Sequence, residues 1–207
     1  MDTTLTVAAT GNAPSLLLRP WTHDDVPALV AAHRDPLIRR WLRHPMTTVE
    51  QARQAIGARQ ADIRAGTAFS FAVLAAADGS PGDLVGGVSL RGVGGAAVNG
   101  EVGYWVAAAA RGRGVAPRAL RAMCDWAFGS SRFPVLERLR LIHTVGNEAS
   151  CRVAGKAGFA LSTLLPPLPP EFPHAGHLHI RPRADAGERA RKRHAGYRAA
   201  PGWRGLR

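Results

Sequence analysis

Apolar and polar positions along the chain change period several times, and these changes predict a mixed α/β domain. Between Leu120 and Ala127 the apolar residues fall at i, i+3, i+4 and i+7, the spacing of a helix with one buried face. Residues 99–106, ahead of this helix, alternate between two sides as the residues of a strand do. A turn with two glycines and two arginines, at 111–114, joins the strand to the helix.

The rest of the chain divides in the same way. Apolar runs and turn residues predict further strands at 16–20, 69–76, 84–90, 139–145 and 176–182, with another beginning at Phe159. Helices are predicted from Thr22 onward, from Asp35 to Leu42, from Thr48 to about Ala65 and from Glu148 to Ala157. Strands and helices in this proportion predict a sheet covered by helices.

The turn at 111–114 has the composition of an anion site. The first amides of a helix have no intrahelical acceptor, and the helix dipole places partial positive charge there. Gly112 and Gly114 let the backbone approach a ligand closely, and Arg111 and Arg113 add charge. No Gly-Lys-Ser/Thr follows the glycines, and Pro117 stands where a dinucleotide fingerprint needs its third glycine. We therefore interpret the turn as a phosphate or pyrophosphate cradle of another kind.

Two motifs indicate which kind. The series Arg111-x-x-Gly114-x-Ala116 resembles the acyl-coenzyme A pyrophosphate loop of the GNAT superfamily of N-acetyltransferases. The preceding Glu-Val-Gly-Tyr-Trp-Val, at 101–106, resembles the fourth strand of that superfamily, especially in its RimJ/RimL-type branch. A second motif runs from Asn147 to Phe159 and begins 36 residues after Arg111, within the usual range of the superfamily.

The resemblance implies a fold and a co-substrate. The GNAT fold is α/β (α+β), with a mixed, mostly antiparallel central sheet of about seven strands, splayed at strands 4 and 5 and flanked by helices. The co-substrate is acetyl-CoA, whose pantetheine arm is expected along the edge of the fourth strand. The residues expected to bind coenzyme A are Trp105, Val106, Arg111, Gly112, Arg113, Gly114, Val115, Ala116, Asn147 and Ser150.

The expected chemistry is direct acetyl transfer to an amine without an acyl-enzyme. Glu101 is the carboxylate of the fourth strand, and the resemblance makes it the general base; it is otherwise an exposed edge residue or an anchor for the substrate ammonium. Ser150 is the candidate acid for the thiolate, or forms a hydrogen bond at its helix start. Tyr104 is an alternative acid, although alternation points it away from Glu101. Asn147 caps its helix or binds the pantetheine amides.

The acceptor stays open at this level. In the family, the region around Trp41, Arg43 and His44 forms one wall of the acceptor pocket, so these side chains are candidates for substrate contact; alternatively Trp41 packs and the basic pair is solvated. The acceptor is a protein N-terminal amine or a small-molecule amine. A second hypothesis is a non-catalytic acyl-CoA-binding or regulatory module.

Charge and composition say less about the function than the two motifs do. The net charge of +12 suits an anionic co-substrate, and no basic-aromatic face predicts nucleic-acid binding. Segments 1–14 and 184–207 are predicted to be flexible tails, the second one basic, around an N-acyltransferase domain at 15–183. No apolar run approaches the roughly 20 residues of a membrane span. With no signal peptide evident, we expect the protein in the cytoplasm. A monomer or a homodimer is expected.

The cysteines and histidines predict no metal site. Cys124 and Cys151 lie in predicted helices without metal-ligand spacing and are expected to be reduced thiols. No carboxylate or cysteine is expected to join His174, His177 and His179, so exposed strand histidines explain them more simply than metal ligands.

Overall fold

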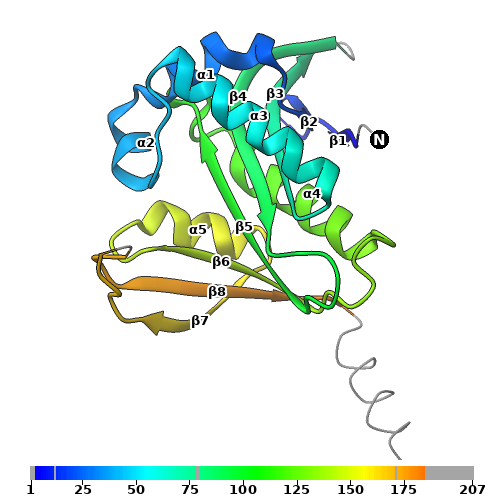
Figure 1. Cartoon of the computed structure of the whole chain (residues 1–207), viewed down its shortest axis with the longest axis vertical. Helices are drawn as coiled ribbons and strands as arrows, with labels where there is room; N and C mark the ends of the chain where they lie inside the picture. Colours follow the sequence, from blue (N-terminus) through cyan, green and yellow to red (C-terminus); the bar gives the residue numbers. More distant parts are fainter. Residues whose placement is uncertain (1–2, 12, 78–79, 171, 185–207) are drawn as a thin grey trace, which may run out of the picture.

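An eight-stranded sheet forms the frame of the computed structural model, which describes residues 3–11, 13–77, 80–170 and 172–184 (Figure 1). The strands are β1 (Leu5–Val7), β2 (Ser15–Pro20), β3 (Ala68–Ala77), β4 (Ser80–Arg91), β5 (Asn99–Val106), β6 (Arg138–Thr144), β7 (Ala160–Leu165) and β8 (Gly176–Pro182). Their order is β1-β2-β3-β4-β5-β6-β8-β7, and every neighbouring pair is antiparallel except β5 and β6.

Helices cover both faces of this sheet. They are α1 (Val26–His33), α2 (Pro36–Trp41), α3 (Val49–Ala65), α4 (Val115–Gly129) and α5 (Glu148–Lys156), with short 3-10 turns η1 (His23–Asp25) and η2 (Ala108–Ala110). The larger core lies under α4 and α5, and a second core lies under α1 and α3. The expected mixed sheet flanked by helices is thereby confirmed.

Local sequence signals account for the helix positions. The face predicted for α4 is fully buried, from Leu120 to Ala127. Thr48 accepts a hydrogen bond from the amide of Gln51 in a capping box at the start of α3, and Gly66 ends that helix in the left-handed region with φ +72°. Each cap satisfies backbone groups that a helix end leaves without partners.

The chain before residue 15 differs from expectation. Leu5–Val7 forms β1 and pairs with β2, with Leu5 opposite Leu18 and Val7 opposite Leu16, so this part of the predicted tail is a strand and supplies the eighth one. Leu5 and Val7 pack against the larger core. A strand of three residues is too short for alternation to reveal it.

Two other expectations concern the chain ends and membranes. The predicted basic tail falls almost wholly on residues 185–207, which lie outside the described residues, and the domain limits at 15 and 183 stay a prediction. In the part of the chain that the structure describes, no helix is long and apolar enough to cross a membrane.

The splay predicted at strands 4 and 5 of the family lies between β5 and β6, because residues 99–106, which resemble the fourth strand, form β5. These strands pair from Asn99 opposite Arg138 to Val102 opposite Leu141, and the pairing then ends although β5 continues to Val106. Beyond that point β5 stays paired with β4 and β6 with β8, so the two halves of the sheet diverge (Figure 1). Backbone groups of Gly103–Val106 that face β6 are thus left for an extended ligand.

Candidate active site

The predicted phosphate cradle is a left-handed turn that opens onto a cavity. Gly112 has φ +75°, and Gly114, the N-cap of α4, has φ +71°, conformations that side chains beyond glycine rarely adopt. No side chain caps the helix, so the amides at its start are left for another partner. A cavity of about 480 Å³ lies against this turn, lined by Thr10, Ala13, Gly112, Arg113, Gly114 and Arg118.

The N-terminal segment forms the far wall of this cavity, which the sequence did not predict. Arg118 on α4 donates hydrogen bonds to the carbonyl oxygens of Pro14, at 2.8 Å, and of Ala8, at 2.5 Å. The guanidinium therefore ties the start of the chain to the first turn of α4. This arginine adds positive charge to a cavity already bounded by Arg113.

The side chain of Arg111 contacts a carboxylate of this chain. Its guanidinium forms an ion pair with Asp35, the N-cap of α2, whose carboxylate also accepts from the amide of Ile38 at 2.9 Å. The hydrogen bond from Arg111 lowers the pKa of Asp35. Arg111 thus fixes the turn to α2, and its charge is largely neutralised by a carboxylate of this chain.

Two hydroxyls meet beyond the point where β5 and β6 separate. The hydroxyl of Tyr104, on β5, lies 2.9 Å from that of Ser150, on α5, and either can donate. Burial raises the pKa of Tyr104, which keeps the phenol protonated at neutral pH. Ser150 is 8% exposed, and its amide donates to the side-chain oxygen of Asn147 at 3.2 Å. Asn147 therefore caps α5, the first of the two roles considered for it.

Glu101 lies on the opposite side of β5. Its register partner on β6 is Arg140, in the penultimate pair before the strands separate. Its carboxylate forms a 3.2 Å ion pair with Arg91 of β4, and its side chain is 32% exposed. The carboxylate is thus accessible but already paired with a cation.

Trp105 shares this side of β5 by alternation. Its ring is stacked against Trp21 at 6.2 Å and is met edge-on by His33 at 4.8 Å. The partly buried side chain packs against the second core. Burial lowers the pKa of His33 to about 4, and its Nδ1 accepts from the amide of Met46 at 2.9 Å.

The predicted wall of the acceptor region contacts the connection between β7 and β8. The guanidinium of Arg43, after α2, lies 4.5 Å from the ring centre of Phe172, in the connection between β7 and β8. Trp41 is half-buried at the end of α2, with the guanidinium of Arg40 4.7 Å from its ring centre. Contact with an acceptor stays a prediction for Trp41.

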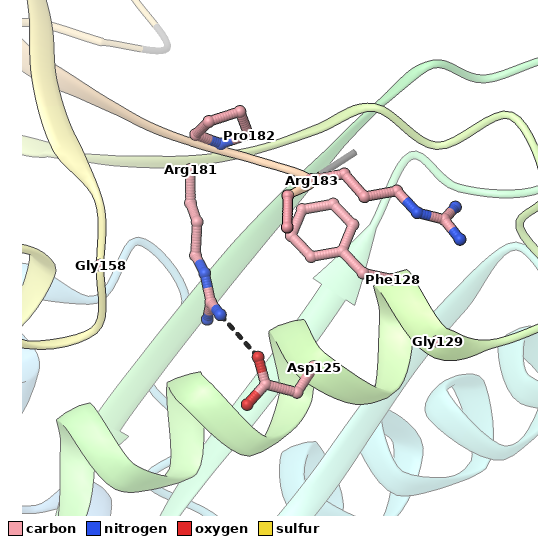
Figure 2. Close-up of a pocket in the computed structure, with 8 residues that line it drawn as sticks. Asp125, Phe128, Gly129, Gly158, Arg181, Pro182 and Arg183 are labelled. Atoms are coloured by element: carbon pink, nitrogen blue, oxygen red, sulfur yellow. Dashed lines mark hydrogen bonds and ion pairs between the residues drawn. The ribbon is translucent and has the colours of Figure 1, made fainter. Parts of the chain in front are cut away.

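A second cavity, of about 530 Å³, lies at the other end of α4. Figure 2 shows its ion pair, in which Arg181 of β8 reaches Asp125 of α4 at 2.6 Å. Phe128, Gly129 and Gly158 complete much of the lining. None of the predicted site residues lines this cavity, so we place the candidate active site at the separated strands instead.

The structure also joins residues that the sequence left apart. His143 of β6, Cys151 of α5, and His177 and His179 of β8 bring one nitrogen or sulfur atom each into a group no wider than 4.8 Å. The expectation of exposed strand histidines without a cysteine is wrong, because Cys151 lies 3.3 Å from Nδ1 of His177 and His179 is 4% exposed. The sequence did not show that His143 on β6 is the register partner of His177, or that Cys151 of α5 lies against both.

Comparisons with known proteins agree with the fold described above. A family model described as an acetyltransferase (GNAT) domain matches residues 15–160. RimJ of Mycobacterium smegmatis, solved in complex with a CoA disulfide, is similar with a TM-score of 0.72 and 22% identity, over 93% of this chain and 94% of that chain. No curated protein sequence matches this chain.

Two further solved structures are similar. RimL, described as a ribosomal L7/L12 alpha-N-protein acetyltransferase in complex with coenzyme A, has a TM-score of 0.71 and 19% identity, over 87% of this chain and 98% of that chain. The microcin C7 self-immunity acetyltransferase MccE, in complex with acetyl-CoA and AMP, has a TM-score of 0.71 and 16% identity, over 83% of this chain and 93% of that chain. At these identities the likeness shows the fold.

Proposed function

This chain belongs to the acetyltransferase (GNAT) family, and we propose that it moves an acetyl group from acetyl-CoA to a primary amine, on a protein N-terminus or a small molecule. The observation that carries the proposal is the separation of β5 from β6 beside a helix that begins at a left-handed glycine turn. An extended thiol arm with a pyrophosphate at one end suits both features.

Binding of acetyl-CoA uses the start of α4 and the free edge of β5. The pyrophosphate accepts hydrogen bonds from the amides around 112–116, and the positive end of α4 favours its charge. Arg113 and Arg118 bound the same cavity and add to this field. The pantetheine arm pairs with backbone near Trp105 and Val106, and a backbone N–H there stabilises the oxyanion that forms on the acetyl carbonyl.

The proton steps run through side chains on the two sides of β5. Glu101 takes a proton from the substrate ammonium, directly or through a water, and the free amine attacks the thioester carbon. As the carbon–sulfur bond breaks, the thiolate takes a proton from the pair formed by Ser150 and Tyr104, and the second proton lost by the attacking nitrogen returns to that pair through solvent. The 2.9 Å contact between the two hydroxyls supports treating them as one acid. Trp41 is proposed to contact the acceptor.

A protein N-terminal α-amine is the first acceptor to test. One structural relative is described as an alpha-N-protein acetyltransferase and another as RimJ. Small amines follow, because a third relative is a self-immunity acetyltransferase that holds AMP beside acetyl-CoA.

Glu101→Gln tests the proposed base. Turnover is expected to fall at least about tenfold, while acetyl-CoA affinity measured by calorimetry stays within about twofold. Arg91→Met is the matched control, because it removes the ion-pair partner and leaves the carboxylate in place. Equal turnover in wild type and Glu101→Gln would exclude Glu101 as the base. Acetyl-CoA binding without turnover on any amine of a broad panel would favour the non-catalytic module.

A further inference from the structure

The four cysteine and histidine side chains come from three elements that meet beside the separated strands. His143 on β6 and His177 on β8 are register partners, and His179 lies two residues further along the same face of β8. Cys151 lies in α5, one residue after Ser150. These side chains therefore face one another between the sheet and the helix that covers it.

The distances within this cluster match those of a tetrahedral metal site. Zinc–nitrogen and zinc–sulfur bonds of about 2.0 and 2.3 Å place tetrahedral ligand atoms about 3.3 to 3.6 Å apart. Nε2 of His143 lies 3.1 Å from Nε2 of His179 and 3.4 Å from Sγ of Cys151. Sγ lies 3.3 Å from Nδ1 of His177. No pair exceeds 4.8 Å, so small side-chain rotations would complete the tetrahedron.

Hydrogen bonding alone does not account well for these contacts. Nδ1 of His143 lies 3.0 Å from the carbonyl oxygen of Thr144, so it carries the proton and leaves Nε2 with a single lone pair. Two groups, Nε2 of His179 and Sγ of Cys151, crowd that lone pair. His179 is 4% exposed and its Nδ1 has no hydrogen-bond partner among the described residues. Among the described residues, the hydrogen-bond contact of this buried ring is therefore to another imidazole.

We propose that His143, Cys151, His177 and His179 bind a structural zinc ion. A thiolate and three imidazoles are ligands that zinc prefers, and four protein ligands leave no open position for a substrate. The thiol of Cys151 releases its proton when the metal binds. The contact from His143 to the carbonyl of Thr144 is of the kind that orients a metal-binding imidazole.

The ion would fix α5 to the sheet next to the proposed acid. Cys151 is bonded to the metal in this arrangement, and the preceding residue, Ser150, holds the hydroxyl that contacts Tyr104. Binding of zinc to the folded chain alone stabilises it by mass action. The metal is thus inferred to position α5, and its binding does not depend on which amine is acetylated.

Metal binding to the full chain tests the proposal directly. The protein is stripped with a chelator, and zinc or cobalt(II) alone is then added. We expect about one ion per chain, a higher melting temperature with zinc, and a cobalt spectrum with tetrahedral bands and a thiolate charge-transfer band. A cobalt spectrum without the thiolate band, or no binding in competition with a micromolar indicator dye, would overturn the proposal.

Variants then assign the ligands. Cys151→Ser is expected to lose the thiolate band. His179→Asn is expected to weaken zinc binding at least about tenfold, because even the loss of a group that only orients a ligand costs about 10- to 100-fold in metal affinity. His174→Gln is the matched control, because this exposed histidine lies outside the cluster. Circular dichroism checks folding, and if either variant is unfolded the wild-type cobalt spectrum decides alone. Unchanged cobalt spectra in folded Cys151→Ser and His179→Asn would refute the site.

Discussion

Tyr104 and Ser150 offer the sharpest perturbation of the proposed acid. Their hydroxyls, one on β5 and the other on α5, lie 2.9 Å apart. Tyr104→Phe removes one hydroxyl and keeps the ring, whereas Ser150→Ala removes the other and keeps the backbone amide that donates to the side-chain oxygen of Asn147. If the two hydroxyls protonate the leaving thiolate as one unit, either change should disable that unit.

The expected size follows from the contact. Loss of one partner leaves a hydroxyl in a largely buried position, which costs about 1–2 kcal/mol of folding stability. Loss of a general acid costs about a hundredfold in kcat, or about 2.7 kcal/mol of transition-state stabilisation. The double variant should be no slower than the slower single variant, because groups that act as a unit are not additive. Acetyl-CoA affinity should change little in each case.

The assay is steady-state release of coenzyme A thiol at saturating acetyl-CoA and amine. Because burial raises the pKa of Tyr104 above its usual 10.0, the wild-type rate should not fall through ionisation of this residue below about pH 10. Two results would refute the reasoning: wild-type kcat in both single variants, or losses that multiply in the double variant.

Three further perturbations test the frame of the site. Gly114→Ala places a side chain at φ +71°, so it should lower the free energy of unfolding by about 1–2 kcal/mol and weaken acetyl-CoA binding. Gly155→Ala, at an exposed position of α5, should raise the free energy of unfolding by about 0.5–1 kcal/mol, and urea unfolding compares the two variants. Asp35→Ala loses a helix cap worth about 1 kcal/mol and every acceptor for Arg111, whereas Asp35→Asn keeps one side-chain oxygen. Calorimetry should show weaker acetyl-CoA binding in Asp35→Ala than in Asp35→Asn, and equal affinities would contradict a role of Asp35 in fixing the turn. His33 stays neutral in the folded chain down to about pH 4, so its contribution to folding stability is intact above pH 6.5. About 3 kcal/mol of that stability is lost as the pH falls from 6.5 toward 4, because the unfolded chain takes up the proton first. In His33→Asn the free energy of unfolding should depend less on pH over this range.

The helix α4 and the turn before it were predictable because their signals are local. The periodicity that ends at Ala127 sets the buried face of α4, and the glycines before it set a turn that needs positive φ. Alternation also placed Tyr104 and Glu101 on opposite sides of β5. Each inference needed only neighbours in sequence.

The features that were missed depend on long-range packing. The ion pair of Arg111 with Asp35 forms only because α2 folds against the turn, and a contact of Arg111 with coenzyme A stays a prediction. The cluster around Cys151 becomes visible only when β8 inserts beside β6 and α5 folds over both. No spacing within one element encodes either contact.

Acetyl transfer by the wild-type protein is the most direct test of the central claim. Acetyl-CoA carrying a deuterated acetyl group is mixed with peptides that have free α-amines and with small amines, and the products are analysed by mass spectrometry. The account predicts labelled acetyl on an acceptor amine, one thiol of coenzyme A released for each, and no label on the protein. Tight acetyl-CoA binding with every amine unchanged, or a labelled acyl-enzyme, would contradict it.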